Sequence, residues 1–159
     1  MQITLACVGK LKEKYWTDAL AEFLKRLSAY AKVNIVTIME EKMPEDASAA
    51  TREKVLAKET ERLMQIIPPN SYVILLDLKG KEITSPALAE KIARLTVEGH
   101  SHLTFVIGGP FGYTDALREI ADFRWSFSPL TFTHQMIRVI LVEQIYRAFK
   151  IMRNEKYHH

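Results

Sequence analysis

The residues best suited to chemistry lie near the end of the chain, in a turn at 126–135 and in the long helix expected after it. His134 falls in the first turn of this helix, where the positive end of the helix dipole disfavours imidazolium. A neutral ring there could accept a proton, although a histidine that caps the helix fits the same position. Arg138 falls on an apolar face, where an unpaired guanidinium carries a large desolvation cost. It therefore needs a partner, which could be a ligand, a helix end or a carboxylate. The carboxylate could belong to the same chain or to a second subunit.

A second group of candidates lies at the predicted ends of three strands. Residues 76–80, 108–112 and 126–132 follow apolar runs and are mostly small or apolar themselves. A pocket built from them would offer backbone N–H and C=O groups between hydrophobic walls, which suits an adenine ring and a thioether or sulfonium tail. Gly108 and Gly109 would let the backbone approach a ligand closely, although a pair of glycines also serves tight packing alone.

A basic segment follows the first predicted strand. Lys10, Lys12 and Lys14 are interleaved with apolar and acidic residues and are followed by Tyr15 and Trp16. Lysines with adjacent aromatic rings can hold a phosphate backbone and stack on bases. The alternative is a solvated loop with Trp16 in the core.

Several common enzyme templates are missing from the sequence. The first predicted strand ends at Gly9 without a G-x-G-x-x-G, and there is no P-loop, so neither a dinucleotide-binding fold nor the commonest open-sheet methyltransferase design is supported. The histidines lack metal-ligand spacing, and we expect no metal. The single cysteine, Cys7, lies in an apolar run and is expected to be a core residue of a reduced, intracellular protein.

The composition fits one domain spanning residues 1–159. A chain of 159 residues with 48% hydrophobic content can bury an adequate core, and a net charge of +3 restricts any RNA-binding surface to a local patch. The first residues lack the basic leader and the length of a signal peptide. The late helix is interrupted by Arg138, Glu143, Arg147 and Lys150, so it is not expected to span a membrane. We expect a cytoplasmic protein.

Apolar runs alternate with amphipathic stretches about five times along the chain. The runs predict strands at 2–8, 33–39, 72–78, 103–107 and 123–127. The stretches predict five helices: one of about 16 residues that begins near Tyr15 and Trp16, one at 48–67, one from Pro86 to Gly99, a short one from Asp115 to Ala121, and the late helix. Ser85 is the expected N-cap of the third helix, with Pro86 at its first position. This order predicts an α/β sandwich with a mainly parallel sheet.

The late helix is apolar around nearly its whole circumference. Glu143, Arg147 and Lys150 fall on one narrow stripe, and apolar side chains cover most of the rest of residues 137–152. Such a helix cannot lie on the surface of a small monomer. We therefore predict that one side packs on the chain's own sheet and another side on a second copy of the protein.

Six segments together resemble the RlmH family, bacterial methyltransferases of the SPOUT class that act on large-subunit ribosomal RNA. These segments are Val8–Lys12, Leu76–Gly80, Phe105–Pro110, Ser126–Met136, Arg138–Ala148 and the tail Tyr157–His158. The histidine-containing turn and the run from Glu143 to Phe149 are the most specific of them. Thr133 stands where the family pattern usually has proline; a threonine can instead cap the helix.

The resemblance implies an α/β fold with a C-terminal trefoil knot, a homodimer, and S-adenosylmethionine bound in the knot. The implied reaction is methylation at N3 of a pseudouridine in 23S ribosomal RNA on the assembled ribosome. The cofactor-binding residues that it implies are Leu76, Gly108, Phe127, Ser128, Pro129, Leu130, Thr131 and Phe132.

The N3 proton has to leave during such a reaction, so a proton acceptor or a cation beside the resulting anion would help. We expect His134 to be the acceptor and Arg138 or Arg147 to orient the substrate through its charge. Tyr157 and His158 are expected to form a tail that closes over the cofactor of the partner subunit.

Two other functions remain compatible with the residues alone. In a non-catalytic ribosome- or RNA-binding protein, the segment from Lys10 to Tyr15 would hold RNA and the glycine turn would be structural. In a small-molecule enzyme built on the same sheet, the pocket would bind a cofactor but the protein would not bind ribosomes. Stabilisation by S-adenosylmethionine and binding to ribosomes separate these possibilities.

Overall fold

Five strands form one sheet in which each neighbouring pair of strands runs parallel. The computed structural model describes residues 1–157. The strands follow the order β2 (Lys32–Ile38), β1 (Gln2–Val8), β4 (His102–Ile107), β3 (Tyr72–Glu82) and β5 (Phe123–Ser126). This arrangement confirms the predicted α/β fold with a parallel sheet.

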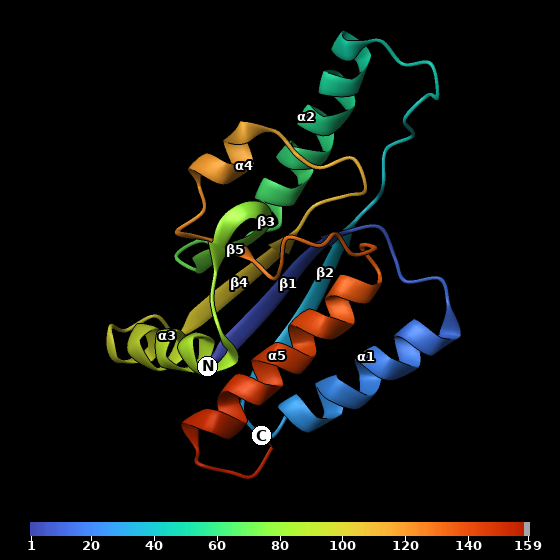
Figure 1. Ribbon diagram of the computed structural model, residues 1–159. Helices are drawn as coiled ribbons and strands as arrows, with labels where there is room; N and C mark the ends of the chain where they lie inside the picture. Colours follow the sequence, from blue (N-terminus) through green and yellow to red (C-terminus); the bar gives the residue numbers. More distant parts are fainter. Residues whose placement is uncertain (158–159) are drawn as a thin grey trace.

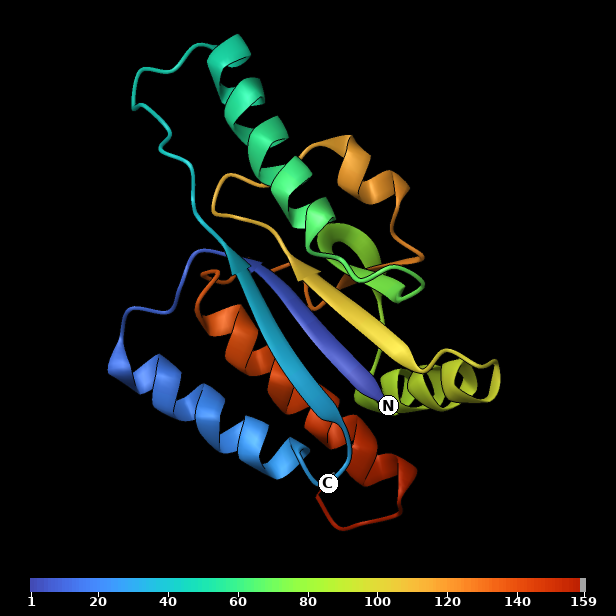
Figure 2. The same ribbon diagram turned by 180° about the vertical axis from the view of Figure 1, so that it is seen from behind.

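Helices cover both faces of the sheet (Figure 1, Figure 2). One face carries α1 (Lys14–Leu27), α3 (Ser85–Val97) and α5 (Met136–Met152), and the other carries α2 (Ala49–Gln65) and α4 (Asp115–Glu119). Side chains that alternate along a strand are therefore buried in one of two cores. Leu5 and Cys7 of β1 belong to the core under α1 and α5, whereas Ala6 and Val8 belong to the core under α2. Burial on both faces explains why this strand is apolar at all positions from Ile3 to Val8 except Thr4.

The late helix, α5, lies between α1 and α3 against the sheet (Figure 1). The chain itself therefore covers more of this helix than the sequence suggested, and Ile145 and Ala148 are completely buried without a second subunit. The charged stripe lies on the outward face, where Arg147 forms an ion pair with Glu143 at 2.6 Å. The apolar surface left for a second copy lies mainly at the start of the helix, around the exposed Met136.

Two local predictions differ from the structure. Thr84, not Ser85, is the N-cap of α3, and its hydroxyl oxygen accepts from the Ala87 N–H at 3.3 Å. The Ser85 hydroxyl is instead used to donate to Gln144 of α5 at 2.6 Å. β3 also continues beyond the predicted end at residue 78, because its pairing with β5 resumes at Lys81 after a bulge.

Among the described residues, no helix is long and apolar enough to cross a membrane.

Candidate active site

Two adjoining cavities lie at the carboxyl ends of β3, β4 and β5, where open parallel sheets bind ligands. Their volumes are about 120 Å³ and 330 Å³. Together they fall within the range of small-molecule sites. Both cavities share five lining residues, so we treat them as two parts of one site. These shared residues are Leu76, Asp77, Leu78, Phe132 and Ile137.

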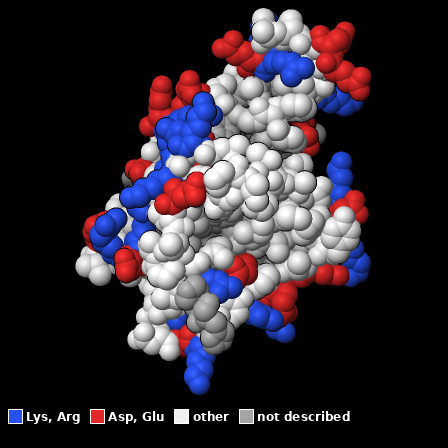
Figure 3. Space-filling model, in the orientation of Figure 1, with Lys and Arg blue, Asp and Glu red and all other residues white. Residues whose placement is uncertain are grey.

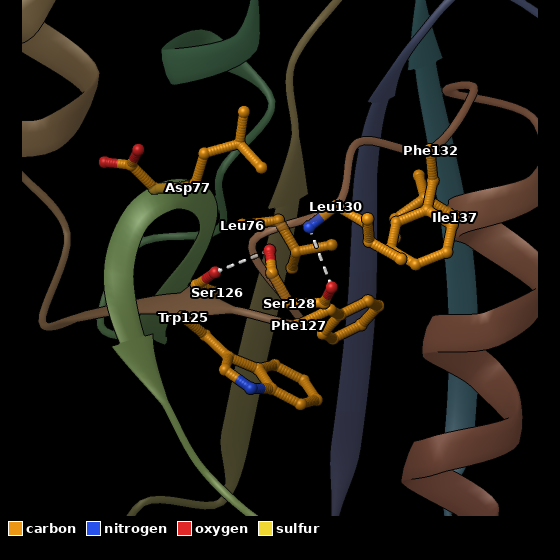
Figure 4. A pocket seen from close by; sticks show the side chains of 10 residues that line it. Leu76, Asp77, Trp125, Ser126, Phe127, Ser128, Leu130, Phe132 and Ile137 are labelled. Atoms are coloured by element: carbon orange, nitrogen blue, oxygen red, sulfur yellow. Dashed lines mark hydrogen bonds between the residues drawn. The ribbon is translucent and has the colours of Figure 1, made fainter.

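Most of the predicted cofactor-binding residues line this site. Leu76 and Phe132 line both parts, and Gly108 lines the larger. Phe127, Ser128 and Leu130 line the smaller part, which Figure 4 shows. Pro129 and Thr131 belong to the same turn, and both are exposed. The structure thus brings together three segments that are far apart in the sequence, because each follows a neighbouring strand.

The turn after β5 is held by hydrogen bonds of its own serines. The Ser126 hydroxyl donates to the Ser128 carbonyl oxygen at 3.2 Å, and the Leu130 N–H donates to the Ser128 hydroxyl oxygen at 2.8 Å (Figure 4). These bonds define the shape of the turn while Leu130 stays 69% exposed. An exposed leucine at the rim of an apolar cavity can cover a ligand without first leaving a packed core.

Gly108 allows the chain to pass close to Tyr113. A Cβ atom at Gly108 would lie 2.4 Å from Cδ1 of the Tyr113 ring. The Tyr113 hydroxyl donates to the Leu76 carbonyl oxygen at 2.9 Å, and burial raises the pKa of this phenol, which keeps it protonated as a donor. Gly108 is therefore required for packing that connects the glycine turn to the wall formed by β3.

Asp77 is the buried charge of the site, and the sequence interpretation did not select it. One of its oxygens, Oδ2, accepts from Arg118 Nε at 3.2 Å and from Arg124 Nε at 2.8 Å, while Oδ1 accepts from the Lys79 N–H at 3.0 Å. Burial alone would raise the pKa of Asp77, but these donors outweigh it and hold the pKa below its usual range. A lone acidic residue within an apolar strand was the signal that could have revealed this group.

His134 lines the larger cavity, as predicted. Its pKa is lowered chiefly by burial and then by the positive charges of Arg138 and Lys12. The predicted neutral ring is therefore supported, although by a different cause from the helix dipole. The helix itself begins two residues later, with Gln135 at the N-cap position. The Thr133 hydroxyl oxygen accepts from the Met136 N–H at 3.3 Å, so Thr133 supplies a side-chain acceptor for the first turn although it is not the N-cap residue.

Arg138 lies behind the cavity wall and is 2% exposed. Its Nη1 donates to the Gly9 carbonyl oxygen at 3.0 Å, and its Nη2 donates to the Val8 carbonyl oxygen. Within the described residues it forms no ion pair, and burial lowers its pKa. Its partner is therefore the end of β1, which was not among the partners we predicted. This placement favours an indirect role over contact with a substrate.

Arg147 lies farther along α5, and Tyr157 lies in the segment that follows this helix. Ten residues separate Ile137, at the cavity, from Arg147, which corresponds to about 15 Å along a helix. Arg147 stacks over the Tyr157 ring at 4.8 Å, and the Tyr157 hydroxyl donates to Glu143 at 3.2 Å. Within one chain these residues do not meet the cavity. His158 lies outside the described residues.

The basic segment after β1 is exposed, and its residues are near one end of the site. Lys10, Lys12 and Lys14 all face solvent, and Lys14 pairs with Asp18 on α1. Tyr15 is 63% exposed and contacts Trp16 edge to face at 5.2 Å. Trp16 is only partly buried, so it is not the core residue that the alternative interpretation required.

No group of histidine, cysteine or acidic side chains among residues 1–157 is arranged to hold a metal ion. Cys7 is buried, and burial raises the pKa of its thiol to about 11, which agrees with the predicted core residue.

The chain is similar to known methyltransferases over nearly its whole length. Residues 1–158 match the family model described as "Predicted SPOUT methyltransferase". Two relatives named "Ribosomal RNA large subunit methyltransferase H" are 51% identical, from Halothermothrix orenii, and 49% identical, from Carboxydothermus hydrogenoformans. In both cases the aligned region covers 99% of this chain and 99% of the relative.

A solved structure supports the fold independently. The probable methylase family protein from Haemophilus influenzae has a TM-score of 0.54 at 14% sequence identity, with 99% of this chain and 70% of that chain covered. At this identity the likeness concerns the fold alone. The family match and the close relatives go further, and they place the chain in the SPOUT methyltransferase family, in its RlmH group.

Proposed function

We propose that this protein is an S-adenosylmethionine-dependent ribosomal RNA large-subunit methyltransferase that modifies N3 of a pseudouridine in 23S ribosomal RNA. The observation that carries the proposal is the cavity at the ends of β3, β4 and β5, which combines apolar walls with a glycine turn. The names of the relatives support the ribosomal substrate. Work on assembled ribosomes would place the protein in the cytoplasm.

The residues of the cavity fit S-adenosylmethionine. Leu76, Leu130 and Ile137 supply apolar walls for a flat ring, and the absence of a side chain at Gly108 leaves room for the Tyr113 ring, which also lines the larger part. Asp77 holds the β3 wall of the cavity in place, because its carboxylate accepts from Arg118 and Arg124. When bound, the cofactor supplies an activated methyl group.

The protein's own contribution is to orient the base, exclude water and accept a proton. His134 faces the larger cavity as a neutral ring, so it is able to take the N3 proton of the base. Arg138 supports this state of His134 from behind the wall, since its positive charge disfavours a second proton on the ring. Arg138 is therefore proposed as a positioning residue.

We further propose a knotted homodimer in which each tail serves the site of the other subunit. A broad uncharged area covers the segment between β5 and α5 and the start of α5 (Figure 3). Leu130, Phe132 and Met136 are exposed there. Burying this area in a dimer would remove apolar surface from water. It would also allow Arg147 and Tyr157 to act at a cavity that they do not line within their own chain, and we propose that His158 acts with them.

Heat unfolding with and without S-adenosylmethionine tests the cofactor. A ligand at about 100 times its Kd adds roughly 2.7 kcal/mol to stability, which raises Tm by several degrees. The next measurement is transfer of a labelled methyl group to ribosomes that lack the modification. Ribosome binding without a cofactor-dependent shift would instead support the non-catalytic RNA-binding protein, and a shift without ribosome binding would support a small-molecule enzyme.

The role of His134 predicts the pH dependence of methyl transfer. Because the pKa of His134 is lowered, the ring stays neutral at pH 7, and the rate should fall only below the ordinary histidine pKa of about 6.5. His134→Gln should lower kcat by about 10²-fold and remove this acid limb. The measurement is kcat against pH for both proteins, and an unchanged acid limb in the variant would assign it to another group.

The proposed role of the tail predicts that substituting Tyr157 lowers the rate of methyl transfer without weakening cofactor binding. Tyr157→Ala should lower kcat at least about tenfold, because the substrate base loses a positioning group. The affinity for S-adenosylmethionine should change little, since Tyr157 does not line the cavity of its own chain, and Tm should fall only modestly, since Tyr157 is partly buried against Tyr146 and Arg147. Unchanged methyl transfer on ribosomes would remove the tail from the mechanism. Tyr15→Ala, at a tyrosine that is 63% exposed, tests the basic segment separately.

A further inference from the structure

We propose that four basic side chains beside the cavity bind the phosphate backbone of the RNA substrate. We call them the β3 ledge: Lys79 and Lys81 of β3, Arg118 of α4 and Arg124 of β5. The ledge lies apart from the basic segment at Lys10–Tyr15, and it rests on the proposed function, since it names the surface that an RNA methyltransferase would use to hold its substrate.

The ledge is continuous with the candidate active site. Lys79 and Arg118 line the larger cavity. Arg124 is bonded to Asp77 of the cavity wall, and the exposed Lys81 pairs in the sheet with Trp125, the residue that follows Arg124. Basic side chains gather over β3 and α4 at one side of the uncharged area in Figure 3. An RNA strand held there would run past the mouth of the cavity.

Both arginines are fixed before any ligand binds. The buried carboxylate of Asp77 accepts hydrogen bonds from Arg118 and Arg124, and the Arg118 guanidinium also lies 4.8 Å from the centre of the Tyr113 ring. The backbone beneath is equally constrained, because a Cβ atom at Gly80 would lie 2.6 Å from the Arg124 carbonyl. A guanidinium held in place loses little conformational freedom when it binds a phosphate.

Each arginine keeps donors for a ligand. In Arg124, both Nε and Nη2 contact the Asp77 carboxylate. In Arg118, Nε donates to Asp77 and Nη1 donates to Asp115. Within residues 1–157, the remaining terminal nitrogen of each guanidinium has no hydrogen-bond partner. The Asp115 side chain is 83% exposed, so its pairing with Arg118 is weak in water and can yield to a phosphate. Lys79 and Lys81 form no ion pair in the same range.

The spread of the four charges favours a polyanion over the carboxylate of the cofactor. A single carboxylate in the cavity could be reached by Lys79 or Arg118, but Arg124 does not line the cavity and Lys81 lies farther along β3. Successive phosphates of one RNA strand can use all four cations at once. These contacts would set the register of the strand and leave the choice of base to the cavity.

The test is a double variant, Lys79→Gln with Lys81→Gln, which leaves the Asp77 cluster intact. We expect its kcat/KM on unmodified ribosomes to fall roughly tenfold at moderate salt, and the slope of log affinity against log salt to become shallower by about one to two. The control, Lys25→Gln with Lys32→Gln, removes the same charge from exposed positions near the other end of the sheet and should behave like wild type. Arg118→Gln should lower kcat/KM further, and a measurement of its Tm checks that this variant is folded.

The outcomes are separable. Ledge variants that match the control in both kcat/KM and salt slope would overturn the ledge, while methyl transfer by the wild type would leave the proposed function standing. A loss of S-adenosylmethionine binding in the Lys79 and Lys81 variant would assign these cations to the cofactor carboxylate and would also overturn the RNA proposal. If the wild type itself neither binds the cofactor nor methylates ribosomes, the proposed function fails first.

Discussion

Gly108→Ala is expected to weaken binding of S-adenosylmethionine by about 2 kcal/mol, roughly 30-fold in Kd. The added methyl group would lie 2.4 Å from Cδ1 and 2.9 Å from Cε1 of Tyr113, well inside van der Waals contact. The Tyr113 ring cannot turn aside freely, because its hydroxyl is bonded to the Leu76 carbonyl and its face is covered by Arg118. Relief of the clash must therefore move the ring, the glycine turn or Leu76, all of which shape the cavity.

Isothermal titration of the cofactor checks this expectation, and a second substitution tests its cause. If the clash is responsible, Tyr113→Ala should partly restore binding when combined with Gly108→Ala, because the ring that opposes the new methyl group is gone. The two substitutions would then be non-additive, as expected for residues in contact. Equal losses in the single and double variants would mean that Gly108 acts through its own backbone and not through Tyr113.

The position of the site was predictable because it depends on strand ends. Apolar runs identified β3, β4 and β5, and the carboxyl ends of parallel strands meet at one edge of a sheet. Segments as distant in the chain as 76–80, 108–112 and 126–132 could therefore be placed together because each follows a predicted strand, and Leu76, Gly108 and Phe132 of these segments line the cavity. The turn after β5 followed from the same rule.

The charged part of the site could not be predicted in this way. Asp77, Arg118 and Arg124 belong to three different elements, and they meet because β3 bulges between Leu76 and Lys81 against β5. No periodicity in the sequence marks such a bulge. The partner of Arg138 was missed for a similar reason, since backbone carbonyls at the end of β1 carry no sequence signal.

The burial of α5 shows another limit of periodicity. An apolar circumference indicates that a helix is covered, but it does not tell which elements cover it. α1 and α3 flank this helix within the chain, so Ile145 and Ala148 need no second subunit. The proposed dimer is therefore argued from the exposed Leu130, Phe132 and Met136, and not from the total apolar content of the helix.

Arg138→Ala is expected to lower the free energy of unfolding by about 3–5 kcal/mol. The substitution empties a fully buried site and leaves the carbonyl oxygens of Val8 and Gly9 without their donors. Arg138→Met fills the same space and removes a buried cation, which offsets part of the loss of the two hydrogen bonds. We therefore expect the methionine variant to lose only about 1–2 kcal/mol. Urea unfolding of both variants gives the comparison, with Arg94→Ala on the exposed face of α3 as a control near zero.

Both variants also test whether Arg138 acts on the chemistry through His134. Removing the cation should raise the pKa of His134 toward its ordinary value, because the repulsion that disfavours the imidazolium is lost. The acid limb of kcat should then move to higher pH in the stable Arg138→Met protein, and titration of the His134 ring by NMR should move with it. A purely structural arginine would lower stability and leave both titrations where they are. An upward shift in the pKa of His134 without a large loss of stability would instead mean that the main role of Arg138 is to keep His134 neutral.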